Sequence, residues 1–232
     1  MSTSSIGIGP SIGRAPSSGA LSSIGVVRTI VRSIAQTLVD SRLDVALARG
    51  LEKVLEDVES PAAGDPAAFL QSVSTTISSR VGGTVGADWA AAFRRAAVAA
   101  RGHDPLSVGD AVTMLRAAID GIQARDGARL GDGTLLDALV PAVDALVRAH
   151  ARGLDAHALV DGMAEAARAG AEATRTIQTA PGQPDTGAVV VALIAERLAA
   201  QWPTGAPSIA PSRCSGCRAT PLCANGPLMP RA

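Results

Sequence analysis

The sequence predicts an all-α protein, an antiparallel barrel or bundle of eight helices. Apolar residues recur at steps of three and four in eight successive segments, which is the spacing of one buried helix face. The chain of 232 residues is 47% hydrophobic but contains only two Phe, two Trp and no Tyr. Its core must therefore consist of Ala, Val, Leu and Ile, and small alanine faces let helices approach closely. No segment competes as a strand.

The chain opens with residues 1–23, which are rich in Ser, Gly and Pro. This segment has too few apolar side chains to offset the conformational entropy lost on ordering, so we expect a disordered leader. It lacks the continuous apolar stretch of a secretory signal, and no apolar run in the chain approaches the roughly 20 residues of a membrane span. We therefore expect a cytoplasmic protein without a membrane partner.

The first three helices follow from apolar stripes and one cap. The first helix carries its stripe between Val27 and Leu38, and the second runs from about residue 41 to 58. A loop between Pro61 and Pro66 follows and ends in Asp65. Because an Asp side chain can accept hydrogen bonds from the first backbone N–H groups of a helix, Asp65 is the expected N-cap of the third helix.

Glycines separate the third helix from the fourth. We expect Gly82, Gly83 and Gly86 to form a loop, and an alanine-rich helix to run from about residue 87 to 101. The fifth helix begins at Ser107, where Ser-x-x-Asp resembles a capping box with Asp110.

The sixth helix follows a Gly-Asp-Gly-Thr turn at residues 131–134. Its apolar residues form one stripe, namely Leu136, Leu139, Val140, Val143, Leu146 and Val147. Asp132 or Thr134 can cap this helix. Alternatively, its first N–H groups and the positive end of the helix dipole suit an anion.

Two helices complete the predicted domain, which spans residues 24–202. Asp155 is the expected cap of the seventh, whose stripe runs from Leu159 to Ile177 and includes Gly170 on a close-contact face. The eighth runs from about residue 186 to 202.

We expect the remaining segment, residues 203–232, to be a disordered tail rich in Pro and Cys. Cys214 and Cys217 have zinc-like spacing, and Cys223 follows. A structural zinc site needs four ligands and no histidine follows His157, so unstructured thiols are expected there.

The overall charge argues against two classes of partner. The chain has 21 basic and 21 acidic residues, a formal net charge of zero. Nucleic acids and anionic membranes are normally bound by a clustered excess of Lys and Arg. We therefore expect neither as a partner.

The turn before the sixth helix resembles the L-subunit (DhaL) family of dihydroxyacetone (glycerone) kinases. In that family Gly-Asp-Lys-Thr-Met precedes a helix reading Asp-x-x-x-Pro-x-x-x-x-Leu. The matching residues here are Gly131, Asp132, Thr134, Asp137, Pro141 and Leu146, whereas Gly133 replaces the lysine. The resemblance covers about residues 24–201. It implies an eight-helix barrel that binds ATP or ADP with Mg²⁺ in the loops at one end.

Further stretches extend the resemblance. Residues 81–86 resemble the family's Val-Gly-Gly-Ala-Ser-Gly, and residues 185–188 resemble its Asp-Pro-Gly-Ala. Asp126 takes the place of a glycine that touches the nucleotide, and Leu135 that of a methionine in the adenine pocket. The resemblance therefore implies a nucleotide site made of Gly82, Gly83, Thr84, Val85, Gly86, Asp126, Asp132, Thr134, Leu135, Asp185, Thr186 and Gly187.

The family's metal loop is changed. Aligning it through residues 49–51 places Asp40 at one of three metal-binding carboxylates and Arg42 at another, with Ala35 at the third. Asp40 and Asp44 could form a weaker Mg²⁺ site, or Arg42 could contact the phosphates directly. It is also possible that Asp40 is only a helix cap and Asp44 a solvated charge.

The resemblance implies a nucleotide-binding subunit that transfers phosphate to dihydroxyacetone or a similar small polyol or ketone. In the family this substrate is held by a separate K-subunit. Phosphoryl transfer depends on cations that neutralise the phosphate oxygens. Because most groups that manage that charge are replaced here, the alternative is a non-catalytic, pseudokinase-like binding or regulatory module.

Overall fold

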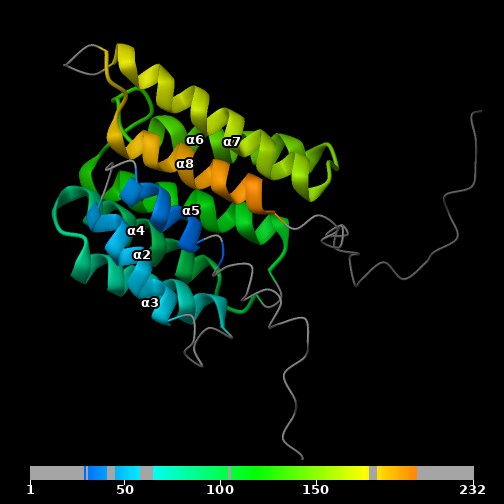
Figure 1. Ribbon diagram of the computed structural model, residues 1–232. Helices are drawn as coiled ribbons and strands as arrows, with labels where there is room; N and C mark the ends of the chain where they lie inside the picture. Colours follow the sequence, from blue (N-terminus) through cyan, green and yellow to red (C-terminus); the bar gives the residue numbers. More distant parts are fainter. Residues whose placement is uncertain are drawn as a thin grey trace, which may run out of the picture.

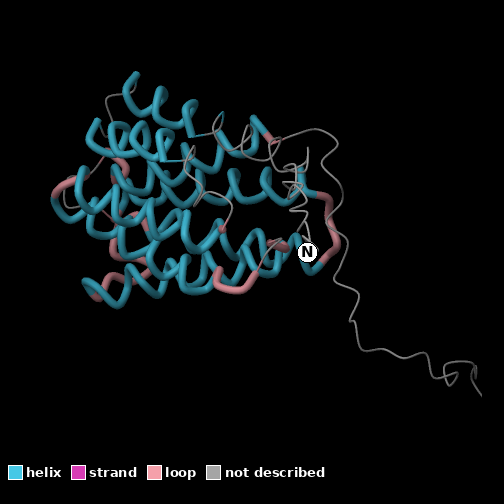
Figure 2. The backbone as a smooth tube through the Cα atoms, turned by 90° about the horizontal axis from the view of Figure 1, so that it is seen from below, coloured by secondary structure: helices cyan, strands magenta, loops and turns pink. Residues whose placement is uncertain are grey.

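The computed structural model describes residues 29, 31–40, 45–57, 65–103, 106–177 and 182–202. Within these ranges the chain is helical and contains no strand, as the sequence predicts (Figures 1 and 2). The predicted leader, residues 1–23, and the cysteine-containing tail, residues 203–232, lie outside the described residues.

Eight α-helices make up the described part of the chain. A helix over residues 31–40 is followed by α2 (Val45–Asp57), α3 (Pro66–Arg80), α4 (Gly83–Ala99), α5 (Val108–Asp126), α6 (Leu136–Ala151), α7 (Ala156–Ala173), the 3₁₀ turn η2 (Thr174–Thr176) and α8 (Thr186–Gln201).

From α2 onward each helix packs against the next one in the sequence, and α6 also contacts α8. Successive helices run in opposite directions (Figure 1). The turns that follow α3, α5 and α7 therefore lie at the same end of the bundle, the left end in Figure 1. We call this the loop end.

The core consists of two large apolar clusters and a smaller one that joins α5, α6 and α7. One large cluster joins α4, α5, α6, α7 and α8, and the other joins the helix over 31–40 to α2, α3, α4 and α8. Trp89 of α4 packs against both. Alanine supplies much of the buried surface, which confirms the expectation of close helix contacts.

Three predicted caps are confirmed. Asp65 accepts a hydrogen bond from the Ala67 N–H at 3.1 Å, and Asp155 accepts one from the Ala158 N–H at 2.9 Å. Ser107 forms the reciprocal capping box at the start of α5. Each cap satisfies N–H groups that have no partner inside the helix.

The expected loop at residues 82–86 is wrong for Gly83 and Gly86, because α4 begins at Gly83 rather than near residue 87. Gly86 lies in the first turn of α4, under the Val81 carbonyl. A Cβ on Gly86 would stand 1.6 Å from the Val81 oxygen, a distance that no side chain tolerates. Glycine at this position permits a close approach rather than breaking the helix.

The predicted stripe of the seventh helix extends too far. The α-helix ends at Ala173 and η2 follows, so Ile177 leaves the helical register and its side chain is 41% exposed. Separately, none of the helices in the described segments combines the length and apolar character that a membrane span requires.

Candidate functional site

The structure brings three of the four candidate stretches together at the loop end. The start of α4 is tied to the end of α5 by an ion pair between Asp88 and Arg125. The start of α8 touches the start of α6, where a Cβ on Gly187 would lie 3.0 Å from the Leu135 Cβ. The turns before α4, before α6 and before α8 therefore border one region (Figure 1).

The first of these stretches, Gly82 with residues 83–85, is hereafter the α4 start. Gly82 is the N-cap with φ −68° and ψ 178°, and no side chain caps the helix there. All four residues are exposed. In the described part of the chain, no side chain accepts a hydrogen bond from the N–H groups of residues 83–85. An uncapped helix start presents free N–H groups and the positive end of the dipole, which together suit an anion.

The second stretch, residues 131–135, is hereafter the α6 turn. Asp137 is only 5% exposed, and its two carboxylate oxygens accept hydrogen bonds from the N–H groups of Gly131 at 2.7 Å and Thr134 at 2.9 Å. The Thr134 hydroxyl accepts from the Leu136 N–H at 3.3 Å. Side-chain oxygen atoms of the chain itself thus accept hydrogen bonds from the N–H groups of Gly131, Thr134 and Leu136 at the α6 turn.

This arrangement decides between the alternatives for the α6 turn. The N-cap position of α6 is Leu135, which has no side-chain cap. Thr134, one residue earlier, accepts from the Leu136 N–H through its hydroxyl, and the predicted cap by Asp132 is wrong. The Asp132 carboxylate instead accepts from the Arg129 N–H at 2.8 Å, within the preceding turn. A phosphate at the α6 turn would meet the negative charge of Asp137 rather than free N–H groups, so the anion alternative fails here.

Asp137 matches the family's helix, but it is not among the predicted site residues. A local signal was available, because Thr134 and Asp137 form a Thr-x-x-Asp pattern directly before an apolar helix, as in a capping box.

The third stretch is the start of α8, which is also closed. Asp185 accepts a hydrogen bond from the Ala188 N–H at 2.8 Å, and its own N–H donates to the buried Thr174 hydroxyl at 2.8 Å. Thr186 is exposed, and Gly187 lies against the buried side chain of Leu135. Leu135 and Gly187 thus form the contact between the second and third stretches.

Sequence reasoning missed the charged link between α4 and α5. The Arg125 Nε donates to the Asp88 carboxylate at 2.5 Å, and a second guanidinium nitrogen lies 3.4 Å from Asp126. Burial raises the pKa of Asp88, although its hydrogen bond and charge contact with Arg125 act in the opposite direction. Asp126 also accepts from the Ala128 N–H at 3.0 Å, which fixes the turn after α5.

The described residues do not assemble the predicted metal site. Asp40, at the end of the helix over 31–40, is exposed and accepts a hydrogen bond from the Gln36 side chain at 2.9 Å. Arg42 and Asp44 lie outside the described residues. No group of three His, Cys, Asp or Glu side chains that could hold a metal occurs in the described ranges. Asp40 is the one predicted ligand within the described residues, so the Asp40–Asp44 site stays a prediction.

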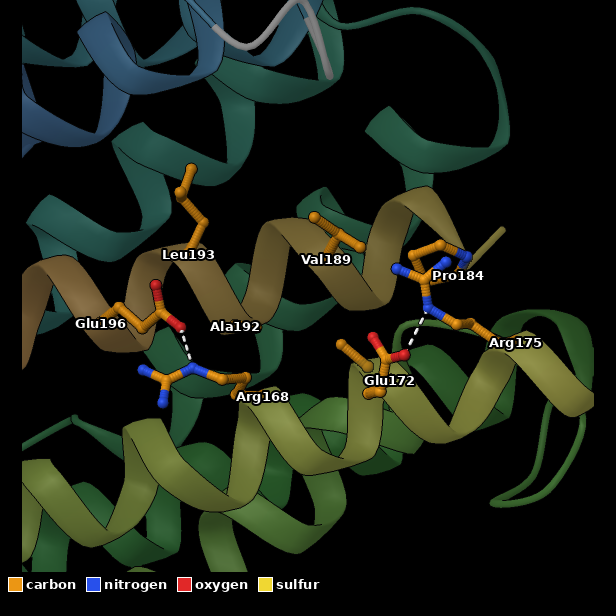
Figure 3. A pocket seen from close by; sticks show the side chains of 9 residues that line it. Arg168, Glu172, Arg175, Pro184, Val189, Ala192, Leu193 and Glu196 are labelled. Carbon is orange, nitrogen blue, oxygen red and sulfur yellow. Dashed lines mark hydrogen bonds and ion pairs between the residues drawn. The ribbon is translucent and has the colours of Figure 1, made fainter. Parts of the chain in front are cut away.

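A groove of about 280 Å³ lies between α7 and α8 (Figure 3). Arg168 pairs with Glu196 across it at 2.6 Å, and Arg175 pairs with Glu172 at 2.5 Å. Arg175 also donates to the Gly182 carbonyl at 2.6 Å. Both arginines therefore already bind oxygen atoms of the chain itself. For this reason the groove is a poorer candidate for an anion site than the α4 start, where the N–H groups have no side-chain partner among the described residues.

These features define the class of the protein, an all-helical domain whose turns before α4, α6 and α8 lie at one end. Residues 43–200 match the family described as the DAK2 domain. The match covers more than half of the 232 residues, and the chain belongs to this family, with a DhaL-like fold.

Individual relatives agree with the family. The chain is 29% identical over 119 residues to the Escherichia coli PEP-dependent dihydroxyacetone kinase, ADP-binding subunit DhaL, covering 51% of this chain and 57% of that protein. It is 35% identical over 128 residues to the L-erythrulose 1-kinase of Mycolicibacterium smegmatis, covering 50% of this chain and 22% of that protein. The chain thus matches about half or less of these relatives' lengths.

The crystal structure of the dihydroxyacetone kinase of C. freundii has the same fold. The native form superposes with a TM-score of 0.63 at 23% identity, over 86% of this chain and 38% of that one. The form in complex with AMP-PNP and Mg²⁺ gives a TM-score of 0.61 at 24% identity, over 86% and 37%.

Proposed function

We propose that this chain is the nucleotide-binding subunit of a kinase of the dihydroxyacetone kinase type. It binds ADP or ATP at the loop end, with the phosphates at the α4 start. One observation carries the proposal: of the three helix starts at this end, the α4 start is the one whose first N–H groups donate to no side chain of the described residues. Two relatives support it, the ADP-binding subunit DhaL of Escherichia coli and the L-erythrulose 1-kinase of Mycolicibacterium smegmatis.

The remaining site residues surround that phosphate position. Thr84 and Val85 belong to the α4 start itself, and Gly86 allows the first turn to pack under Val81. Leu135 is buried against Gly187 and joins the α6 turn to the start of α8 beside that position. A nucleotide spanning these stretches would touch α4, α6 and α8 at once, which fits the contacts that already join them.

The acceptor in the proposal is dihydroxyacetone or a similar small polyol or ketone, presented by a separate K-subunit. That partner would dock at the loop end, because phosphate is transferred only between groups in contact. Five of the eight exposed large apolar side chains in the described ranges border this end. They are 36–55% exposed and comprise Val39, Val45, Val85, Leu130 and Ile177. Exposed apolar side chains around a functional site are typical of a protein interface.

A second candidate, a non-catalytic nucleotide-binding module, is favoured by one specific observation. Asp40 is the one carboxylate of the predicted metal set that the described residues supply, and it is occupied by Gln36. Mg²⁺ is usually held by one or two carboxylates together with the nucleotide phosphates. Both candidates share nucleotide binding and differ in phosphoryl transfer, so two measurements separate them.

The first measurement is the melting temperature with ADP, ATP or adenosine, each with and without Mg²⁺. A ligand at a hundred times its dissociation constant adds about 2.7 kcal/mol of stability, which a melting experiment resolves. We expect ADP and ATP to stabilise the protein and adenosine, which lacks phosphates, to do so far less. Equal shifts for adenosine and ADP, or no shift for any of the three, would refute the proposed site.

The second measurement is formation of dihydroxyacetone phosphate from ATP after a dihydroxyacetone-loaded K-subunit is added. We expect product with the native chain and loss of product in Leu130→Asp, with ADP binding retained. Val98→Asp is the matched control, since Val98 is equally exposed, at 50%, but lies in the last turn of α4, away from the loop end. Nucleotide binding without any product would establish the non-catalytic module.

A further inference from the structure

We infer that Asp137 is a positioning residue of the nucleotide site: its buried carboxylate holds the α6 turn in the shape that places Thr134 and Leu135. This inference rests on the proposed function. It concerns a residue that does not touch the ligand, since Asp137 is 5% exposed and both of its oxygen atoms bond to the backbone.

The first argument is the span of the two hydrogen bonds. One oxygen accepts from Gly131, six residues earlier in the sequence, and the other from Thr134, three residues earlier. Together they bridge the ends of the Gly-Asp-Gly-Thr segment. Gly131 and Gly133 both adopt positive φ, at 99° and 72°, and the segment lies outside the regular hydrogen bonding of α6. The carboxylate adds two side-chain hydrogen bonds that fix this irregular backbone.

The second argument is that the backbone of Asp137 is held in place by the packing of α7. Gly170 of α7 packs so closely on the start of α6 that a Cβ there would lie 2.1 Å from the Asp137 carbonyl oxygen. The backbone that carries the carboxylate is thus clamped by the neighbouring helix. Because α7 restrains the backbone of Asp137, the carboxylate that binds the exposed turn is held in a fixed position.

The third argument concerns what the turn carries. Leu135 is the last residue of the turn and lies against Gly187 at the start of α8. A displaced α6 turn would move Leu135 away from that contact, and the second and third stretches of the site would separate. A residue without ligand contact can therefore alter nucleotide affinity through geometry alone.

The test compares Asp137→Asn with Asp144→Asn, an exposed carboxylate two turns further along α6. Asparagine replaces one of the two carboxylate oxygens with an NH₂ donor, so the N–H group that is bonded to that oxygen in the native protein loses its acceptor. At a temperature well below both melting transitions, we expect the ADP dissociation constant to rise about tenfold or more in Asp137→Asn. Asp144→Asn should stay within about twofold of the native value.

A second measurement reports the turn itself. Arg129 is exposed and lies two residues before Gly131, so trypsin cleavage after Arg129, located by mass spectrometry, measures how firmly the segment is held. We expect faster cleavage in Asp137→Asn than in Asp144→Asn. A purely structural role would lower the melting temperature while leaving both the affinity and this cleavage unchanged, and that result would overturn the inference.

If Asp137→Asn does not fold, amide hydrogen exchange of the native protein tests whether Asp137 holds the turn. We expect the Gly131 and Thr134 amides to exchange slowly without nucleotide, because Asp137 already binds them. Free exchange that slows only when ADP is added would refute positioning by Asp137. Failure of the native protein to bind ADP would instead overturn the proposed function, and this inference with it, whereas ADP binding unaffected by Asp137→Asn would overturn the inference alone.

Discussion

The α4 start and the α6 turn lie at the same end of the bundle, yet their N–H groups have opposite surroundings. Gly82 leaves the α4 start without a capping side chain, and the residues that follow are exposed. At the α6 turn, Asp137 and Thr134 already occupy the corresponding donors. A helix start that is satisfied by its own chain adds stability, whereas an unsatisfied one keeps its binding capacity for a ligand.

The largest expected effect on stability comes from a substitution that disrupts the first turn of α4. Gly86→Ala would place a methyl group on the Val81 carbonyl, and we expect the free energy of unfolding to fall by about 3 kcal/mol. Gly162→Ala is the control, because no atom lies within 4 Å of the new Cβ in the middle of α7. Chemical denaturation should show Gly162→Ala unchanged or stabilised by up to about 1 kcal/mol. Equal effects of the two substitutions would show that Gly86 has no special contact.

A smaller effect on stability is expected at the start of α8, where, as at the α6 turn, side chains accept hydrogen bonds from the backbone. Thr174 is fully buried, and its hydroxyl accepts from the Asp185 N–H. Thr174→Val keeps the shape but leaves that donor unpaired, so we expect a loss of about 2 kcal/mol in the free energy of unfolding. Thr176→Val, at an exposed hydroxyl two residues away, should change it by less than about 0.5 kcal/mol. A loss as small for Thr174→Val would mean that the Asp185 N–H finds another partner.

The smallest expected effect is a pH dependence at the base of the α4 start. Burial raises the pKa of Asp88 above its ordinary value of 3.8, so the folded state holds this proton more tightly than the unfolded state. The stability contributed by this group is therefore greatest below about pH 3.8 and is lost as the pH rises through the raised pKa.

Urea unfolding between about pH 3 and 6 checks this sign. Relative to Asp88→Asn, the native protein should become less stable as the pH increases. Asp120→Asn, at an exposed position on α5, should follow the native curve. A native protein that gains stability over Asp88→Asn with rising pH would show that the ion pair with Arg125 outweighs burial.

Features that depend on a few neighbouring residues could be predicted from the sequence. Asp65, Ser107 and Asp155 each cap a helix that begins within the next three residues, and the apolar stripes were sufficient to predict the all-helical fold. The beginning of α4 could not be predicted in this way. Three glycines lower helix propensity, and the reason for Gly86 lies in a contact with Val81 that only the folded backbone reveals.

The candidate site shows the same division. Its turns could be placed at one end from the alternation of the helices, but their chemistry depends on longer-range contacts. Asp88 and Arg125 are separated by 37 residues and meet only because α4 and α5 pack side by side. The roles of Arg42 and Asp44 stay predictions, since both lie outside the described residues.

The contrast between the two helix starts is tested most directly by introducing a cap at Gly82. Its φ of −68° suits any residue, and no atom lies within 4 Å of an added Cβ. Gly82→Asp and Gly82→Asn would both cap α4, but only the aspartate brings a negative charge to the proposed phosphate position. We expect neither variant to lower the melting temperature, and Gly82→Asp alone to raise the ADP dissociation constant by about tenfold or more. An unchanged ADP dissociation constant in Gly82→Asp would contradict a phosphate site at the α4 start.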